Sequence, residues 1–222
     1  MLPISIVPSL PAKSFEELRV LAQALTGVAS GMQIDIVDGV FAPHVSWPFA
    51  ELDALQSLRQ LQKITTDFSV EMDCMVMYPE RYLETFVQLG VDRVIVHMGS
   101  TDAYAQIIEH AQEHGYRIGL AFTNDQNMED VHPYIDSVDY VQVMGIKEVG
   151  QQGQPFDVRT LQTVRDLRSK YPELEIAVDG AVNKETIPQL YAAGVTRFAP
   201  GSAVAKAADP KTAYESLVAL LF

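Results

Sequence analysis

The sequence predicts an α/β protein of the (β/α)₈ barrel type, and three observations lead to this prediction. Short runs rich in β-branched residues alternate with stretches in which apolar residues recur every three or four positions. Eight such strand-and-helix units fit the 222 residues at about 28 residues each, within the ~200–250 residues of such barrels. No linker, composition break or low-complexity segment divides the chain. We therefore expect one domain over residues 1–222, and prefer the barrel to an open doubly wound sheet, which alternates in the same way.

The expected helices begin and end at recognisable signals. Ser14 precedes Glu17 by three residues, which is the spacing of a capping box. Gly90, Gly115 and Gly194 each follow a helical stretch, where glycine supplies the left-handed cap. The apolar stripe of the first helix is Phe15, Leu18, Leu21, Ala22 and Leu25. The expected strands are Ile4–Ser9, Met32–Ile36, Ser69–Cys74, Arg93–Met98, Arg117–Phe122, Tyr140–Met144, Glu175–Val178 and Arg197–Ala199.

Composition excludes several classes of protein. The formal net charge is −13, which argues against a protein that binds nucleic acid through its phosphates. The single cysteine, Cys74, excludes a disulfide framework and a zinc site built from cysteines. No apolar run approaches the ~18–20 residues that a membrane span needs. The first ten residues lack the basic start of a signal peptide, so we expect a cytoplasmic protein without membrane contacts.

Acidic residues stand near the carboxyl ends of three expected strands. Side chains alternate along a strand, so Gln33 and Asp35 share one face, as do Glu71 and Asp73, and Asp179 ends the seventh strand. Any one of these acids alone is also compatible with a buried carboxylate satisfied by backbone donors, or with a turn. Three at the same end of a barrel indicate function, because a buried charge is costly unless it is paired, bound to a metal or used.

The histidines give weaker signals. His97 ends the fourth expected strand, where a core histidine is favoured over a catalytic one. The other four, His44, His110, His114 and His132, are expected in loops or on helix surfaces, and they lack metal-ligand spacing.

Glycine-bearing turns predict a phosphate site. The segments 180–183 and 200–203 follow the seventh and eighth expected strands, where barrels often bind phosphate through backbone N–H groups and the start of a short helix. The longest irregular segments, Val37–Pro48 and Gly145–Phe156, also follow strands. No basic residue stands out as dedicated to a phosphate, so we expect backbone amides to carry its charge.

Taken together, these segments resemble the ribulose-phosphate 3-epimerase family, which has a phosphate-binding TIM barrel. The resemblance runs in order along nearly the whole chain. Its motifs are Val7–Leu10, Asp35–Pro43, Asp73–Tyr82, the loop with Gly150, Gly153, Gln154 and Phe156, Val178–Asn183, and Gly201–Ala203.

The resemblance implies an isomerase that inverts the carbon next to the ketone of a ketose phosphate, as between ribulose 5-phosphate and xylulose 5-phosphate. Two aspartates on opposite faces of that carbon would exchange its proton, and these roles fall on Asp35 and Asp179. Ser9 would contact the substrate. The residues implied to hold the phosphate are Gly153, Gly180, Gly201 and Ser202. Members of the family commonly form homo-oligomers, so a homo-oligomer is also expected.

The chain departs from the family pattern where a divalent metal is implied. That metal is held by two histidines together with the two aspartates, but Gln33 and Asp73 stand at the histidine positions. Asp35 and Asp179 would remain as ligands. An all-oxygen set of this kind suits Mg²⁺ or Mn²⁺ better than Zn²⁺. The alternative is that no metal binds, in which case at least one of the crowded carboxyls has a raised pKa and can donate a hydrogen bond to the enediolate.

Further departures lie in the phosphate-binding segments, where Val149, Gln152 and Ala181 replace a proline and two glycines. They leave open a divergent sugar-phosphate-binding barrel with a different or lost activity. The decarboxylases of related barrels use Asp-x-Lys on the third strand, whereas Glu71–Asp73 contains no lysine. A purely structural role would leave the acids at the strand ends unexplained.

Overall fold

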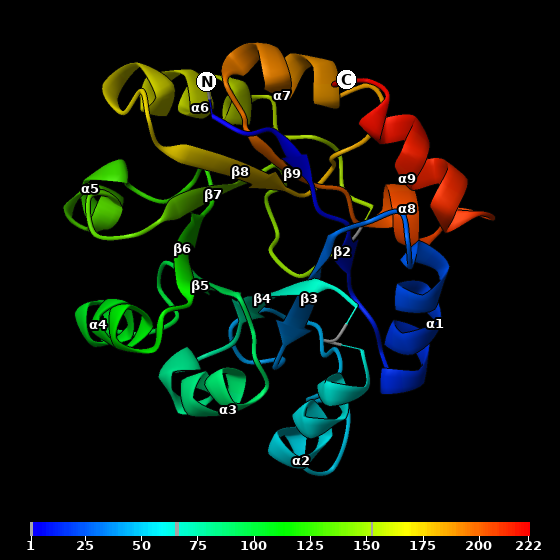
Figure 1. Ribbon diagram of the computed structural model, residues 1–222. Helices are drawn as coiled ribbons and strands as arrows, with labels where there is room; N and C mark the ends of the chain where they lie inside the picture. The colour runs from blue at the N-terminus through cyan, green and yellow to red at the C-terminus, as the bar shows by residue number, and fades with distance from the viewer. Residues whose placement is uncertain (1, 65–66, 152) are drawn as a thin grey trace.

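The computed structural model describes residues 2–64, 67–151 and 153–222, and it shows a barrel of parallel strands surrounded by helices (Figure 1). Each strand of the sheet pairs with the next in the order β1-β9-β8-β7-β6-β5-β4-β3-β2. The strands are β1 (Ser5–Ile6), β2 (Ser9–Leu10), β3 (Gly31–Val37), β4 (Ser69–Met75), β5 (Arg93–His97), β6 (Arg117–Phe122), β7 (Tyr140–Met144), β8 (Glu175–Asp179) and β9 (Arg197–Ala199). The predicted (β/α)₈ TIM barrel is confirmed.

The first strand closes the barrel and is the one strand whose predicted form differs. Instead of a single strand over Ile4–Ser9, the structure has β1, which pairs with β9, and β2, which pairs with β3. Pro8 lies between them and has no N–H to donate to a ladder, which explains the interruption. Its carbonyl still accepts from Gln33 N at 2.9 Å, and Ser9 N donates to the carbonyl of Pro200 at 3.1 Å. Residues 5–10 therefore join both ends of the sheet.

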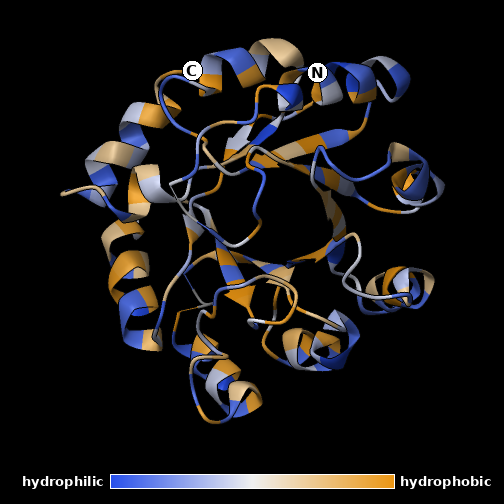
Figure 2. Cartoon of the chain, turned by 180° about the vertical axis from the view of Figure 1, so that it is seen from behind, coloured by the Kyte–Doolittle hydropathy of each residue, from blue (hydrophilic) through white to orange (hydrophobic). Residues whose placement is uncertain are grey.

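The helices lie outside the sheet and turn their apolar sides toward it. Of the predicted stripe of α1, Phe15, Leu18, Ala22 and Leu25 are buried. Hydrophilic and hydrophobic residues are distributed around the outer helices (Figure 2). The α-helices are α1 (Phe15–Leu25), α2 (Ala54–Leu58), α3 (Leu83–Gln88), α4 (Tyr104–His114), α5 (Met128–Ile135), α6 (Arg159–Lys170), α7 (Ile187–Ala193), α8 (Ser202–Ala205) and α9 (Pro210–Val218), and the 3₁₀ helices are η1 (Arg59–Lys63) and η2 (Pro79–Arg81). Among the described residues, no helix is long and apolar enough to cross a membrane.

The predicted cap residues are found at the helix ends. Glu17 N donates to the Ser14 hydroxyl at the start of α1. Gly115 and Gly194 follow α4 and α7 with φ of 75° and 111°, a region that L side chains rarely adopt. These turns bring the chain directly from each helix into the next strand of the barrel.

A charged layer fills the barrel interior at the amino-terminal ends of the strands. Glu71 lies there, 2.9 Å from Arg197 and 4.0 Å from Arg93, and it accepts a hydrogen bond from the Tyr140 hydroxyl at 3.1 Å. Arg93 also pairs with Glu175 at 2.6 Å. Glu71 and Asp73 share one strand face, as predicted, but Glu71 belongs to this lower layer. The charge of Glu71 is thus compensated far from the carboxyl ends of the strands.

Candidate functional site

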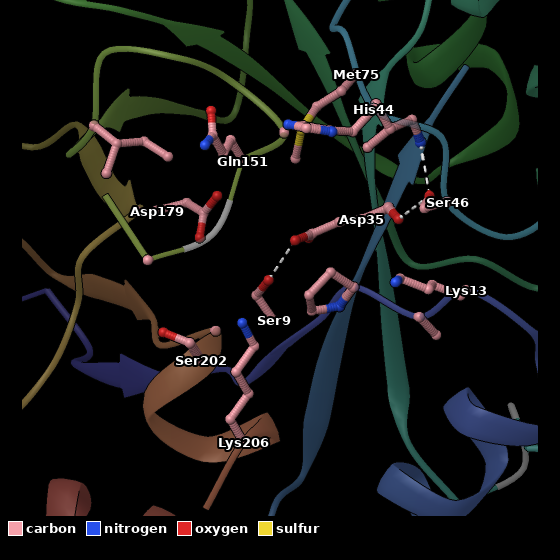
Figure 3. A pocket seen from close by; sticks show the side chains of 18 of the residues that line it. Ser9, Lys13, Asp35, His44, Ser46, Met75, Gln151, Asp179, Ser202 and Lys206 are labelled. Carbon is pink, nitrogen blue, oxygen red and sulfur yellow. Dashed lines mark hydrogen bonds between the residues drawn. The ribbon is translucent and has the colours of Figure 1, made fainter. Parts of the chain in front are cut away.

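A cavity of about 640 Å³ opens at the carboxyl ends of the strands, and it brings together every residue to which the sequence assigned a catalytic or substrate-binding role. Its size is typical of small-molecule sites. Figure 3 shows Asp35 and Asp179 facing the cavity, with Ser9 and Ser202 beside them. The predicted residues that line it are Ser9, Asp35, Gly153, Asp179, Gly180, Gly201 and Ser202.

Asp35 is the fifth residue of β3 and reaches the cavity from the barrel interior. Its carboxylate accepts hydrogen bonds from the Ser9 hydroxyl at 2.6 Å and from the Gln33 amide nitrogen at 3.1 Å. Burial raises the pKa of Asp35 to about 7, and the nearby Asp73 carboxylate adds to the rise, while the two hydrogen bonds oppose it. Asp35 therefore exchanges its proton close to neutral pH.

Asp179 is the last residue of β8 and is 7% exposed at the cavity floor. Burial raises the pKa of Asp179 well above its usual value, and repulsion from Asp35 and then Asp73 raises it further. Close carboxylates cannot all ionise cheaply in a buried site. Burial and repulsion therefore favour the protonated form of Asp179.

Asp73 lies beneath this pair and does not line the cavity. His97 Nε2 is 2.7 Å from its Oδ1, and the amide nitrogens of Gln33 and Gln142 are 3.2 and 2.9 Å from its Oδ2. Asp73 is 0% exposed. His97 is therefore a core histidine held by Asp73, in line with the favoured interpretation of the sequence.

The glycine-bearing turns form part of the cavity wall. Gly150 and Gly153 have φ of 80° and 81°, and both line the cavity together with Gly180 and Gly201. A Cβ on Gly180 would stand 2.7 Å from the side chain of Ile146. The Gln152 substitution lies outside the described residues. This wall exposes backbone to a ligand, as a phosphate site requires.

The sequence did not reveal that two lysines line the cavity, so backbone amides are not the only groups near the expected phosphate position. Lys206 follows α8, four residues after Ser202, and Lys13 precedes α1. Figure 3 shows the Lys206 side chain extending toward Ser9 and Ser202. The spacing of one helical turn from Ser202 is the signal that could have identified Lys206. His44, Ser46 and Met75 are further lining residues that the sequence did not single out.

Ala181 keeps a glycine-like backbone conformation. Its φ is 55°, and its carbonyl accepts hydrogen bonds from the Thr186 hydroxyl at 2.8 Å and from the Asn183 amide at 3.1 Å. These contacts hold the turn after β8 in a left-handed conformation that costs an L side chain about 1–2 kcal/mol.

We expect Ala181→Gly to stabilise the protein. The change relieves the left-handed strain, but it also adds freedom to the unfolded chain, worth about 0.4–1 kcal/mol. The net gain in the free energy of unfolding should be roughly 0.5–1 kcal/mol, measured by urea denaturation. Ala213→Gly, inside α9, is the control and should lose about 1 kcal/mol. Equal losses in both variants would show that the Ala181 backbone carries no strain.

Comparison with known proteins places the chain in a family. Residues 5–205 match the family model described as "Ribulose-phosphate 3 epimerase family". The chain belongs to the ribulose-phosphate 3-epimerase family. It is similar to ribulose-phosphate 3-epimerase of Schizosaccharomyces pombe, with 28% identity over 98% of this chain and 93% of that protein. The cytoplasmic isoform from Oryza sativa subsp. japonica is 31% identical over 92% of this chain and 89% of that protein.

Solved structures agree on the fold. A 3-hexulose-6-phosphate synthase superposes with a TM-score of 0.71 and 21% identity, covering 96% of this chain and 98% of that chain. A tryptophan synthase α-subunit from Pyrococcus furiosus has a TM-score of 0.74 at 15% identity, covering 100% and 99%. At such identities the likeness supports the barrel architecture alone.

The residues at the implied metal position of the ribulose-phosphate 3-epimerase family do not fit a divalent ion. The amide nitrogen of Gln33 lies between the carboxylates of Asp35 and Asp73 and donates to both. The reversed amide would place oxygen against two carboxylates, so the N–H groups must face them. His97 Nε2 lies against Oδ1 of Asp73, and the amide nitrogen of Gln142 donates to its Oδ2. The Oε1 atoms of Gln33 and Gln142 have no hydrogen-bond partner among the described residues. The side of Gln33 that faces the two carboxylates, however, carries N–H donors, which cannot bind a cation.

Proposed function

We propose that this chain inverts the carbon next to the ketone of a ketose phosphate, interconverting sugars of the ribulose 5-phosphate and xylulose 5-phosphate type. The observation that carries the proposal is the pair of buried carboxyls, Asp35 and Asp179, at the floor of a cavity with a glycine-rich wall. Membership of the ribulose-phosphate 3-epimerase family and relatives that bear this name support it.

In the proposed reaction the two aspartates act in turn on one carbon. One carboxylate removes the proton from carbon 3, and the electron pair moves toward the ketone to form an enediolate. The other carboxyl, protonated beforehand, delivers a proton to the opposite face. This sequence needs one ionised and one neutral acid at the same pH. The raised pKa values of Asp35 and Asp179 support this proposal.

No metal takes part in the proposed reaction. In the family a divalent ion stabilises the charge of the enediolate, whereas here the amide of Gln33 joins Asp35 to Asp73. The neutral carboxyl can donate a hydrogen bond to the enediolate instead, in a site where burial strengthens such a bond. This is the second of the alternatives that the sequence left open.

The deciding experiment is proton NMR of D-ribulose 5-phosphate with the protein in D₂O. We expect the proton on carbon 3 to exchange and xylulose 5-phosphate to appear, equally with EDTA and with added Mg²⁺ or Mn²⁺. Activity that requires an added ion would contradict the metal-free mechanism. Sugar-phosphate binding without exchange under any condition would overturn the epimerase proposal and favour the divergent binding barrel.

The plot of kcat/KM against pH should be bell-shaped. Asp35 must be ionised when Asp179 is protonated, or the reverse, so the rate falls when both carry a proton and when neither does. With the pKa of Asp35 at about 7, the acid limb of kcat/KM should fall below neutral pH. A rate that stays constant from pH 5 to 9 would show that this pair does not perform the rate-limiting proton transfer.

Lys206 is proposed to bind the substrate phosphate. Its Nζ forms no ion pair with any described residue, and its side chain extends along the cavity wall beside Ser202 (Figure 3). Lys206→Met should raise KM by roughly 10- to 100-fold with little change in kcat, since a charge-assisted hydrogen bond is worth about 1.5–3 kcal/mol and the phosphate stays bound throughout. Lys211→Met, on the exposed side of α9, is the matched control. An unchanged KM would show that Lys206 does not bind the substrate phosphate.

A cytoplasmic location, a homo-oligomeric state and the domain limits 1–222 stay predictions. Sedimentation analysis of the purified chain would test the second of these. Its acidic character continues to argue against nucleic acid as a partner.

A further inference from the structure

A second group of ligating side chains lies on the outer surface, between α3 and α4. Glu84 of α3 and His110 and His114 of α4 each offer a ligand atom, and these atoms lie within 4.8 Å of one another. We call this group the outer histidine cluster. Glu84 and His114 are exposed and His110 is half-buried. Both helices belong to the ring outside the barrel (Figure 1), whereas the candidate active site opens among the loops after the strands.

The hydrogen bonds of the two histidines leave the same nitrogen of each ring available. His114 Nδ1 is 2.9 Å from the carbonyl of His110, which can only accept, so Nδ1 carries the proton and Nε2 has the free lone pair. His110 Nδ1 is 3.0 Å from the Tyr116 hydroxyl, which can accept from it in the same way. The rings are stacked with centroids 4.1 Å apart. Partners on the second nitrogen are what orients histidines that bind metals.

Glu84 completes the set from the neighbouring helix. Its Oε2 lies 4.0 Å from His110 Nε2, while its Oε1 accepts a hydrogen bond from Gln88 at 3.2 Å. One carboxylate oxygen is thus oriented by its own helix and the other faces the imidazole. His110 and His114 are spaced by four residues on one helix, so the expectation that these histidines lack metal-ligand spacing is wrong for this pair. With a nearby carboxylate they form a set of three ligands that zinc commonly uses.

We propose that the outer histidine cluster binds Zn²⁺ or another divalent transition ion through His110 Nε2, His114 Nε2 and Glu84. Imidazole ligands select such ions over Mg²⁺ and Ca²⁺, which prefer oxygen. The solvent-exposed side leaves a fourth position for water. The ion would link α3 to α4, so its role is to hold two neighbouring helices together, independently of the proposed sugar-phosphate reaction.

Zinc titration of the metal-free protein against a chromophoric chelator tests this site directly. We expect one equivalent to bind, with affinity reduced at least 100-fold in His114→Gln and about tenfold in Tyr116→Phe, which loses only the partner of Nδ1. Glu109→Gln, on the same helix but outside the cluster, and Asp35→Asn, in the other site, should bind as the parent does. Co²⁺ added in place of zinc should give a visible absorption band that His114→Gln lacks.

Two results of the titration would overturn the outer histidine cluster as the zinc site. Binding that survives in His114→Gln and disappears in Asp35→Asn would assign the ion to the cavity. Equal weak binding in all variants would show only scattered surface contacts. His114 is exposed, so loss of its imidazole should leave the fold intact, which the melting temperature without metal would verify. The epimerase activity of His114→Gln should match that of the parent. Zinc binding and epimerase activity are therefore tested by separate measurements, and one proposal can fail without the other.

Discussion

Asp35→Asn should reduce the rate of proton exchange by a factor of about 10²–10⁴, the range over which a positioned acid or base contributes. The substitution keeps the shape of the site. The asparagine oxygen can accept from Gln33, and its amide can donate to the Ser9 hydroxyl, which now donates to Asp35 at 2.6 Å. Loss of rate would therefore report loss of the ionisable group. Asp166→Asn, on the exposed side of α6, should retain full activity, and NMR exchange in D₂O measures all three proteins.

The same variant should be more stable than the parent in alkaline solution. The pKa of Asp35 is about 7 in the folded chain and 3.8 for the free side chain, so between these values the folded protein binds more protons. The stability of the parent therefore falls as the pH rises from about 4 to about 7. Three pKa units correspond to a difference of up to about 4 kcal/mol above pH 8. Urea unfolding of parent and variant at pH 5 and pH 9 tests this, and an equal change in both proteins would contradict it.

Glu71→Gln is expected to cost about 3–5 kcal/mol of stability, because it leaves a buried charge without its partner. Arg197 is 8% exposed, and Glu71 lies 2.9 Å from it. With the carboxylate gone, the one side-chain hydrogen bond left to Arg197 among the described residues is to the Ser5 hydroxyl at 3.3 Å. A melting temperature lower by roughly 10 °C should result for a chain of this size.

The surface pair Arg19–Glu16 provides the matched control for Glu71. Its atoms are 2.6 Å apart, but both side chains are largely exposed. Glu16→Gln should leave the free energy of unfolding close to that of the parent, because water screens the exposed pair. If Glu71→Gln and Glu16→Gln lower the free energy of unfolding equally, burial does not set the strength of the interaction between Glu71 and Arg197.

Much of the fold follows from periodicity in the sequence. Seven of the eight expected strands appear nearly as predicted, because their continuous apolar runs and the glycines after the helices are local signals. The first strand differs because Pro8, whose carbonyl faces β3, has no N–H to donate toward that strand, which is distant in sequence. The acids of the cavity were found for a related reason, since alternation along each strand assigns side chains to the barrel interior before any contact is known.

The remaining features depend on contacts between distant segments. The position of Gln33 between Asp35 and Asp73 requires two neighbouring strands in register, with Asp35 opposite Asp73. Lys206 looks in the sequence like the exposed Lys211, and only the turn of α8 brings it to the cavity. His110 and His114 meet Glu84 because α3 packs beside α4. Spacing within one segment relates Lys206 to Ser202 and His114 to His110, but it does not identify neighbours on distant segments.

Closure of the barrel through residues 5–10 has a consequence for aggregation. The short β1 and β2 occupy the hydrogen-bonding edges of β9 and β3, so in the part of the chain that the structure describes neither of these strands leaves an unpaired edge. If this segment detached, two edges would be uncovered together, and exposed edges pair readily with other chains. Proteolysis or truncation near Pro8 should therefore yield self-associating material instead of a smaller folded barrel.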